Sequence, residues 1–238
     1  MSKEVIYQVP NLIKKEALLS EEEYESLYKE SIIDPDKFWA AQATSYLEWI
    51  SKWKKVSESD FLKGKISWFS GGKINATVNC IDRHLKNRAN QTAIIWEGDD
   101  PSISKQITYS QLHEKVCRLS NSLKERGVKK GDRVCIYMPM IPEAAYSMLA
   151  CARIGAIHSV VFGGFSPESL KDRILDSNCK IVITADEGLR GSKKIPLKQN
   201  VDHALQDCPN VHTVLVVKRT GAETNWVKGR DVSYQKIV

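Results

Sequence analysis

The feature that most constrains the fold is a regular alternation of short apolar strands and helices in the C-terminal two thirds of the chain. Pro142 opens a predicted helix that runs to Arg153, Ser166 and Pro167 begin a second helix that ends near residue 176, and a third covers about 198–206. Strands that are apolar on both sides are typical of parallel sheets covered by helices on both faces. The sequence therefore predicts a doubly wound α/β fold with a largely parallel sheet, whose strands are 133–138, 157–162, 180–185 and 213–218.

The N-terminal part has a different pattern. Ser20 and Glu23 form a capping-box pattern, and Asp34-Pro35 begins a second helix, so we expect a helical arm over 20–53. A helix-compatible segment follows the glycine pair near residue 71, and a strand pair near 92–109 precedes a helix over 109–126. We therefore expect a helical extension over 1–90 and an α/β region over 91–238.

Charge and composition exclude several classes of protein. The net charge of +6, from 35 Lys and Arg against 29 Asp and Glu, favours anionic ligands, but no arginine-rich run indicates a nucleic-acid partner. The apolar stretch 144–165 is interrupted by Arg153, Gly155 and His158, so we expect no membrane span. The six cysteines form no C-x-x-C pair and the first residues carry no secretory signal, which predicts reduced thiols and a cytoplasmic protein.

Two loops are the candidates for a binding site. Doubly wound sheets bind ligands beyond the carboxyl ends of their strands, here after Phe162 and after Ala185. Gly163 and Gly164 allow a ligand close to the backbone, although a tight turn alone also explains them. The second loop, 186–194, concentrates Arg190, Lys193 and Lys194, which suit a phosphate; a solvated basic loop is the alternative, and the residues alone leave both open.

Other signatures of catalysis or cofactor binding fail on spacing. Gly71-Gly72-Lys73 is not a phosphate loop because position 67 is Ser, and no G-x-G-x-x-G turn supports a dinucleotide dehydrogenase. The five histidines are scattered, which predicts no metal site. Asp82, Arg83 and His84 are consecutive on a predicted helix and point in different directions, so we interpret them as a packing motif.

The chain resembles the acetyl-CoA synthetases, a branch of the adenylate-forming acyl-CoA synthetases, over nearly its whole length. The segments that carry the resemblance are WFSGGKINATVNCIDRHL, IWEGDDP, GVKKGDRVCIYMPMIPEAAYSMLACARIGAIHSVVFGGFSPESLKDRI and ITADEGLRGSKK. They are similar to the family in order and approximate spacing. By this resemblance residues 91–238 are the first α/β subdomain of the AMP-binding domain, incomplete at its C-terminus.

The resemblance implies an AMP-forming ligase of acetate metabolism. Such enzymes convert acetate, ATP and CoA to acetyl-CoA, AMP and pyrophosphate through acetyl-adenylate, with Mg²⁺. The family's Ser/Thr/Gly-rich phosphate loop and its C-terminal-domain lysine are not found in the sequence. We therefore assign no catalytic residue, place the ATP and Mg²⁺ sites outside these 238 residues, and expect the chain to be an N-terminal fragment that is inactive alone.

The same resemblance assigns a surface for CoA. Phe162, Gly163 and Gly164 match the segment that contacts the adenosine of CoA in the family, with stacking on the aromatic ring. Arg190 and Lys193, within Arg190-Gly191-Ser192-Lys193, match the positions that meet its 3′-phosphate. The family loop often reads R-G-G-K or R-A-G-R; a lysine at the second cationic position keeps the charge but not bidentate contact.

Two alternatives stand beside this interpretation. A relative that prefers propionate shares the MPMIPEA and SVVFGGF segments but differs around NCIDRHL and ADEGLRGSKK, which favours acetate. A stand-alone nucleotide- or CoA-binding module without catalysis would need to be stable with no exposed apolar sheet edge. The expected partners are small molecules and the remainder of the same chain; the sequence leaves the oligomeric state open.

Overall fold

The computed structural model describes residues 7–191 and 193–238, and the chain divides into two compact units, Met1–Ile74 and Asn75–Val238. This division lies before the boundary expected at residue 90. The reason is that the side-chain amide Nδ2 of Asn75 donates to the carbonyl of Arg153 at 3.0 Å and the Thr77 hydroxyl donates to the carbonyl of Leu149 at 2.9 Å. Residues 75–90 therefore belong to the second unit, while their place in a larger domain stays a prediction.

The first unit contains helices and one hairpin. Its helices are α1 (Asn11–Glu16), α2 (Glu21–Ile33) and α3 (Pro35–Tyr46), and the capping box of Ser20 and Glu23 is present as predicted. The antiparallel strands β1 (Lys55–Asp60) and β2 (Lys65–Ser70), joined by the short helix η1 (Phe61–Lys63), were not predicted, because the polar sequence of β1 shows no apolar alternation.

The glycine pair of the first unit is explained by packing. The rings of Trp49, Trp53 and Phe69 contact one another, with centroids 4.8–5.5 Å apart. A Cβ atom on Gly72 would lie 2.6 Å from the ring of Trp49, so only glycine fits at this position. The Gly71-Gly72 turn therefore accommodates an aromatic cluster.

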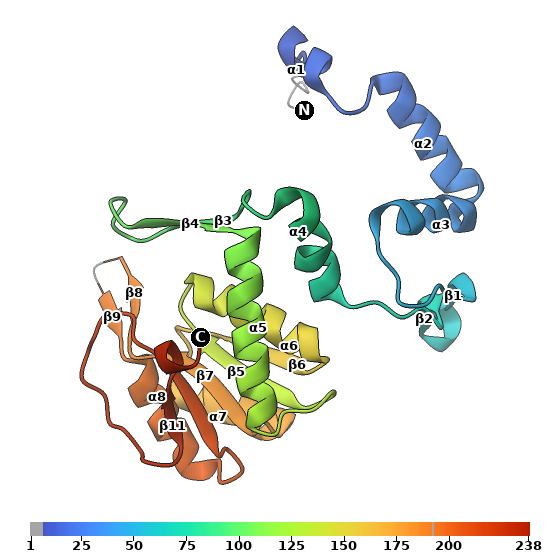
Figure 1. The fold of residues 1–238 in the computed structure, drawn as a ribbon. Coiled ribbons are helices and arrows are strands. Elements are labelled where there is room, and N and C mark those ends of the chain that lie inside the picture. The colour runs from blue at the N-terminus through green and yellow to red at the C-terminus, as the bar shows by residue number, and fades with distance from the viewer. Residues whose placement is uncertain (1–6, 192) are drawn as a thin grey trace, which may run out of the picture. The chain divides into compact units, whose positions relative to one another are not determined.

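The second unit is built on a five-stranded parallel sheet in the order β11-β10-β7-β5-β6 (Figure 1). The predicted α/β fold with a parallel sheet is confirmed. The strand β11 was not predicted, because its three residues are too short to show a pattern. The strands are β5 (Arg133–Met138), β6 (Ile157–Phe162), β7 (Ile181–Ala185), β10 (Thr213–Val217) and β11 (Asp231–Ser233).

Helices α6 (Pro142–Ile154), α7 (Pro167–Ser177) and α8 (Leu197–Ala204) connect these strands. The chain moves from β5 to the edge strand β6, then back across β5 to β7, β10 and β11. Right-handed crossovers therefore place α6 on one face of the sheet and α7 and α8 on the other. The direction reverses beside β5 and β7, and such a reversal opens a crevice at the carboxyl ends of the strands.

Shorter elements complete the second unit. The antiparallel pairs are β3 (Thr92–Glu97) with β4 (Ser104–Thr108), as predicted, and β8 (Gly188–Arg190) with β9 (Lys193–Ile195), where a loop was expected. Helix α5 (Tyr109–Glu125) packs against α6. The remaining helices are η2 (Val78–Asp82), α4 (Arg83–Arg88), η3 (Leu205–Asp207) and η4 (Tyr234–Lys236).

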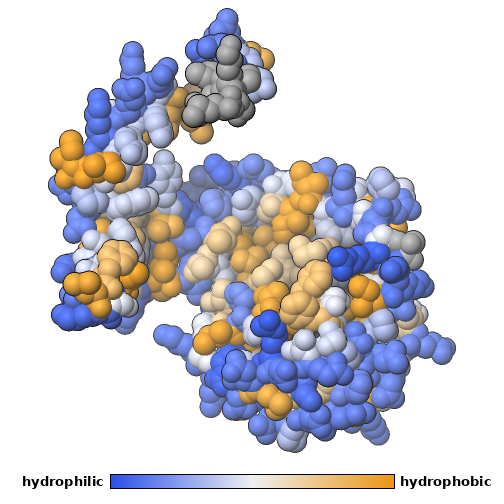
Figure 2. All heavy atoms as spheres, turned by 180° about the vertical axis from the view of Figure 1, so that it is seen from behind, coloured by the Kyte–Doolittle hydropathy of each residue, from blue (hydrophilic) through white to orange (hydrophobic). Residues whose placement is uncertain are grey.

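The core of the second unit lies on both sides of the sheet. Every residue of β7 and β10 is buried, whereas the edge strand β6 exposes Ile157, Val160 and Phe162. Figure 2 shows a broad apolar area across the viewed face of the large second unit, bordered by polar residues. Among residues 7–191 and 193–238 no helix has both the length and the apolar character needed to cross a bilayer.

Candidate functional site

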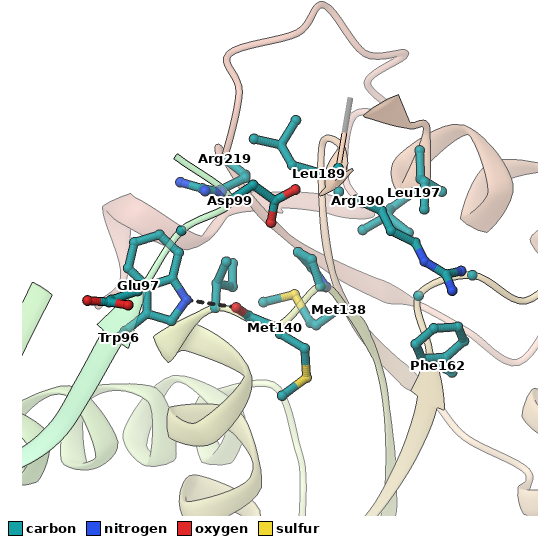
Figure 3. Close-up of a pocket in the computed structure, with 18 residues that line it drawn as sticks. Trp96, Glu97, Asp99, Met138, Met140, Phe162, Leu189, Arg190, Leu197 and Arg219 are labelled. Atoms are coloured by element: carbon teal, nitrogen blue, oxygen red, sulfur yellow. Dashed lines mark hydrogen bonds between the residues drawn. The ribbon is translucent and has the colours of Figure 1, made fainter. Parts of the chain in front are cut away.

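A pocket of about 390 Å³ lies beyond the carboxyl ends of the parallel strands (Figure 3). Its walls come from the segments that follow β5, β6, β7 and β10, together with the end of β3 and the residues after it. This is the crevice that the reversal of strand order predicts. The residues used below are Trp96, Asp99, Met140, Phe162, Gly163, Gly164, Arg190, Leu197 and Arg219.

One wall carries an aromatic ring and a cation. The guanidinium of Arg190, at the end of β8, lies 5.5 Å from the ring centroid of Phe162, at the end of β6 (Figure 3). Both side chains are exposed to the pocket, and Arg190 has no ion pair with a carboxylate among the described residues. The guanidinium covers one face of Phe162, so a planar base would stack on the other face or displace it.

The two glycines after β6, Gly163 and Gly164, bring the backbone close to the Phe162 ring and to Met138. A Cβ atom on Gly163 would lie 3.1 Å from the carbonyl oxygen of Met138, and one on Gly164 would lie 2.6 Å from the Phe162 ring. Neither glycine has a positive φ, so close approach rather than backbone conformation explains them. A larger residue at either position would narrow the pocket or move the Phe162 ring.

The structure brings five of the seven predicted site residues into the pocket: Phe162, Gly163, Gly164, Arg190 and Gly191. Lys193 lies opposite Arg190 in the β8–β9 pair, is exposed, and does not line the pocket. Ser192 lies outside the described residues. Lys194 forms a 3.8 Å ion pair with Glu187, so the basic loop is a hairpin in which one cation, Arg190, faces the cavity.

The opposite wall was not found by sequence reasoning. The guanidinium of Arg219, just after β10, lies 5.0 Å from the ring centroid of Trp96, whose indole N–H donates to the carbonyl of Met140 at 2.8 Å (Figure 3). Lys105 lies 5.9 Å from the same ring. Trp96 stands on β3, outside the parallel sheet, and no spacing rule connects it to Arg219.

A buried carboxylate joins the two loops that carry the arginines. Asp186, which is 3% exposed, accepts hydrogen bonds from the backbone N–H groups of Arg219 at 2.8 Å, Thr220 at 3.2 Å and Gly221 at 2.8 Å. It also accepts from the N–H of Glu187, at 2.7 Å, in its own loop. In the sequence, Asp186 could have been noticed as an acidic residue that directly follows an apolar strand.

The carboxylate of Asp82, in η2, contacts side chains of α5 and α6. Asp82 contacts Arg153 at 2.8 Å and Nε2 of His113 at 3.0 Å, and the same Nε2 lies 3.4 Å from the sulfur of Cys117. These contacts join η2 to α5 and α6, in keeping with the packing motif expected at Asp82. In the described part of the chain, no three His, Cys, Asp or Glu residues are grouped as metal ligands.

Two family profiles match the sequence. The profile described as "AMP-binding enzyme" matches residues 81–237, and the one described as "Acetyl-coenzyme A synthetase N-terminus" matches residues 24–80. Together they cover residues 24–237, which include parts of both compact units. The first alone covers more than half of the chain.

Curated relatives agree with the profiles. The chain is 60% identical over 233 residues to acetyl-coenzyme A synthetase 2 of Pseudomonas aeruginosa, which covers 98% of the chain and 36% of the relative. It is 58% identical over 238 residues to acetyl-coenzyme A synthetase of Alkalilimnicola ehrlichii, which covers 100% and 37%. The chain thus spans about a third of the length of these relatives.

A solved structure, acetoacetyl-CoA synthetase from Streptomyces lividans, superimposes with a TM-score of 0.80 at 22% identity. The match covers 95% of the chain and 34% of that structure. At this identity the similarity establishes the fold alone.

Proposed function

The chain belongs to the family of AMP-binding enzymes, and from this membership we propose that it is the N-terminal portion of an acetate:CoA ligase. The complete enzyme would convert acetate, ATP and CoA to acetyl-CoA, AMP and pyrophosphate through acetyl-adenylate. The observation that carries the proposal is the pocket in which the predicted CoA residues meet, in a chain 58–60% identical to proteins named acetyl-coenzyme A synthetase.

We assign to this chain the nucleotide end of CoA. Arg190 would bind the 3′-phosphate, because a guanidinium without a carboxylate partner offers several N–H donors to phosphate oxygens. Phe162 would hold the adenine by stacking, and Gly163 and Gly164 would let the ribose approach the backbone. Lys193 would add positive charge from outside the pocket. Ser192 belongs to the same proposed loop in the sequence.

The residues that catalyse adenylation belong to the same proposal. We propose that ATP and Mg²⁺ bind to the part of the enzyme beyond these 238 residues, because the family's phosphate loop and C-terminal-domain lysine are not found in the sequence. The chain alone should bind without turning over.

Acetate as the substrate and the cytoplasm as the location belong to the same proposal. The segments NCIDRHL and ADEGLRGSKK favour an acetate enzyme over a propionate enzyme. Four of the six cysteines are buried, and burial raises the pKa of Cys151 to about 12, so these thiols are protonated and unreactive. A reducing compartment agrees with such free thiols.

Calorimetric titration of this chain with CoA and with 3′-dephospho-CoA tests the proposal. We expect CoA to bind about tenfold more tightly, and we expect Arg190→Ala to abolish that preference, since a charge-assisted contact of about 1.5 kcal/mol is lost. Lys180→Ala is the matched control, because it removes one exposed charge at the other end of β7. Equal affinity for both ligands in the unmodified chain would refute the assignment of Arg190.

A further inference from the structure

The wall opposite Phe162 presents a second cation to the pocket, and its residues have no role in the proposed CoA contacts. We infer that Arg219 is a second phosphate-binding residue. The pocket then takes a nucleotide that carries phosphate at both ends of its ribose, with the 3′-phosphate at Arg190 and the 5′-diphosphate at Arg219. This inference rests on the proposed function, since it names a further contact for the same ligand.

Arg219 is held in place by an aromatic ring that is itself fixed. Its guanidinium lies 5.0 Å from the centroid of Trp96, and the indole N–H of Trp96 donates to the carbonyl of Met140 at 2.8 Å. Stacking on a ring leaves the in-plane N–H donors of a guanidinium free for an anion. Among residues 7–191 and 193–238, Arg219 forms no ion pair with a carboxylate, so its charge is available to a ligand.

The backbone of the Arg219 loop is fixed by hydrogen bonds to a buried carboxylate. The carboxylate of Asp186 accepts the N–H groups of Arg219, Thr220 and Gly221, and the Thr220 hydroxyl donates to the carboxylate of Glu187 at 2.7 Å. Because Asp186 and Glu187 also begin the segment that carries Arg190, one buried carboxylate fixes both arginine loops. Asp186 is therefore a positioning residue for the two phosphate contacts.

Two carboxylates on the same wall oppose an anion there. Glu97 and Asp99 both line the pocket, and Figure 3 shows the Asp99 carboxylate directed toward the cavity. Lys105, close to Trp96, partly offsets their charge. Removal of the Asp99 charge should therefore strengthen binding of a diphosphate at Arg219, an effect opposite in sign to the loss of Arg219.

The experiment is a titration of two ligands into three forms of the full 238-residue chain. CoA carries both phosphate groups, and 3′-dephospho-CoA carries the diphosphate alone. Arg219→Gln should weaken both ligands about tenfold, whereas Arg190→Gln should weaken CoA about tenfold and leave 3′-dephospho-CoA within about twofold. Circular dichroism of each variant checks that the fold is retained.

Three further variants separate the role of Arg219 from general damage to the fold. Asp99→Asn should tighten both ligands by about two- to fivefold, a gain that a misfolded chain cannot give. Asp186→Asn should weaken 3′-dephospho-CoA, because one carboxylate oxygen that accepts the loop amides becomes an NH₂ group. Lys180→Gln, at the far end of β7, should change neither affinity.

The outcomes are distinct. Affinities within twofold of the unmodified chain for Arg219→Gln would overturn the inference while the proposed function stands through Arg190. An Arg219 effect that disappears with 3′-dephospho-CoA would also overturn it, because Arg219 would then read the 3′-phosphate. If neither ligand bound the unmodified chain, the proposed CoA site and this inference would both fall.

Discussion

Two groups of cationic side chains in the second unit differ in whether carboxylates of the protein neutralise their charge. The ammonium of Lys198, with no exposed side-chain area, contacts Asp202 at 2.7 Å, Asp231 at 2.9 Å and the carbonyl of Asn225 at 2.9 Å. Arg190 and Arg219 face the pocket with no carboxylate partner in the described part of the chain. The first group is satisfied by the protein, and the second is available to a ligand.

The difference teaches how to separate structural from functional charge in one sequence. A buried ammonium is tolerated only when acceptors surround it, so Lys198, Asp202 and Asp231 tie helix α8 to β11 and the segment before it. A guanidinium stacked on an aromatic ring keeps its donors free. The partners, not the residue type, decide which role a cation has.

The largest expected effect comes from the buried group. Asp231→Asn leaves Lys198 with one fewer charged partner, and we expect the free energy of unfolding in urea to fall by about 3–5 kcal/mol. The control is Lys171→Ala, which removes a surface pair with Asp207 and should change the free energy by less than about 1 kcal/mol. Similar losses in both variants would remove the distinction between the two groups of cations.

Close packing beneath the pocket gives a smaller effect. In Gly163→Ala the new Cβ meets the rigid carbonyl of Met138, and we expect a loss of about 1–3 kcal/mol in the same unfolding measurement. In Gly164→Ala it meets the exposed Phe162 ring, which can rotate, so stability should change less while CoA affinity falls. A larger stability loss for Gly164→Ala would contradict this account.

The pH dependence of stability tests the buried group through the carboxylate of Asp231. Burial raises the pKa of Asp231, but hydrogen bonds from Arg230, the Val227 amide and Lys198 outweigh it and lower the pKa below the ordinary value of 3.8. The stabilisation is therefore complete above pH 3.8 and is lost as pH falls through the lowered pKa. Acid unfolding of Asp231→Asn should show a shallower dependence than the unmodified chain in this range.

The smallest expected effect on stability comes from a substitution in the pocket. Arg190→Ala should change the free energy of unfolding by less than about 0.5 kcal/mol, because its exposed side chain forms no ion pair with a described residue. The same measurement that reports Asp231→Asn reports this variant. A loss above about 1 kcal/mol would show that Arg190 has a structural role.

Sequence patterns predicted the fold closely where local signals agree with tertiary packing. Strands β5 and β6 occupy the predicted residues, because runs of apolar β-branched residues between helix caps have one stable arrangement. Strands β1 and β11 were missed, since their sequences are polar or short and pairing with a neighbour determines them.

The site was predicted in part, for a physical reason. Phe162 ends the parallel strand β6 and Arg190 lies in the segment after β7, and the position of such segments at one sheet edge can be derived from the chain alone. Trp96 reaches the same pocket from the β3–β4 hairpin, whose placement depends on three-dimensional packing. Arg219 could have been suspected, because it follows β10 at the same edge, but only the hydrogen bonds to Asp186 show that its loop is fixed.

A crystal structure of the chain with CoA tests the central claim most directly. We predict the 3′-phosphate within hydrogen-bond distance of the Arg190 guanidinium, the adenine against Phe162, and the Lys198 group unchanged. CoA bound elsewhere, or bound in the pocket with its 3′-phosphate away from Arg190, would contradict this account. The distinction between the structural charge of Lys198 and the ligand-binding charge of Arg190 would then be lost.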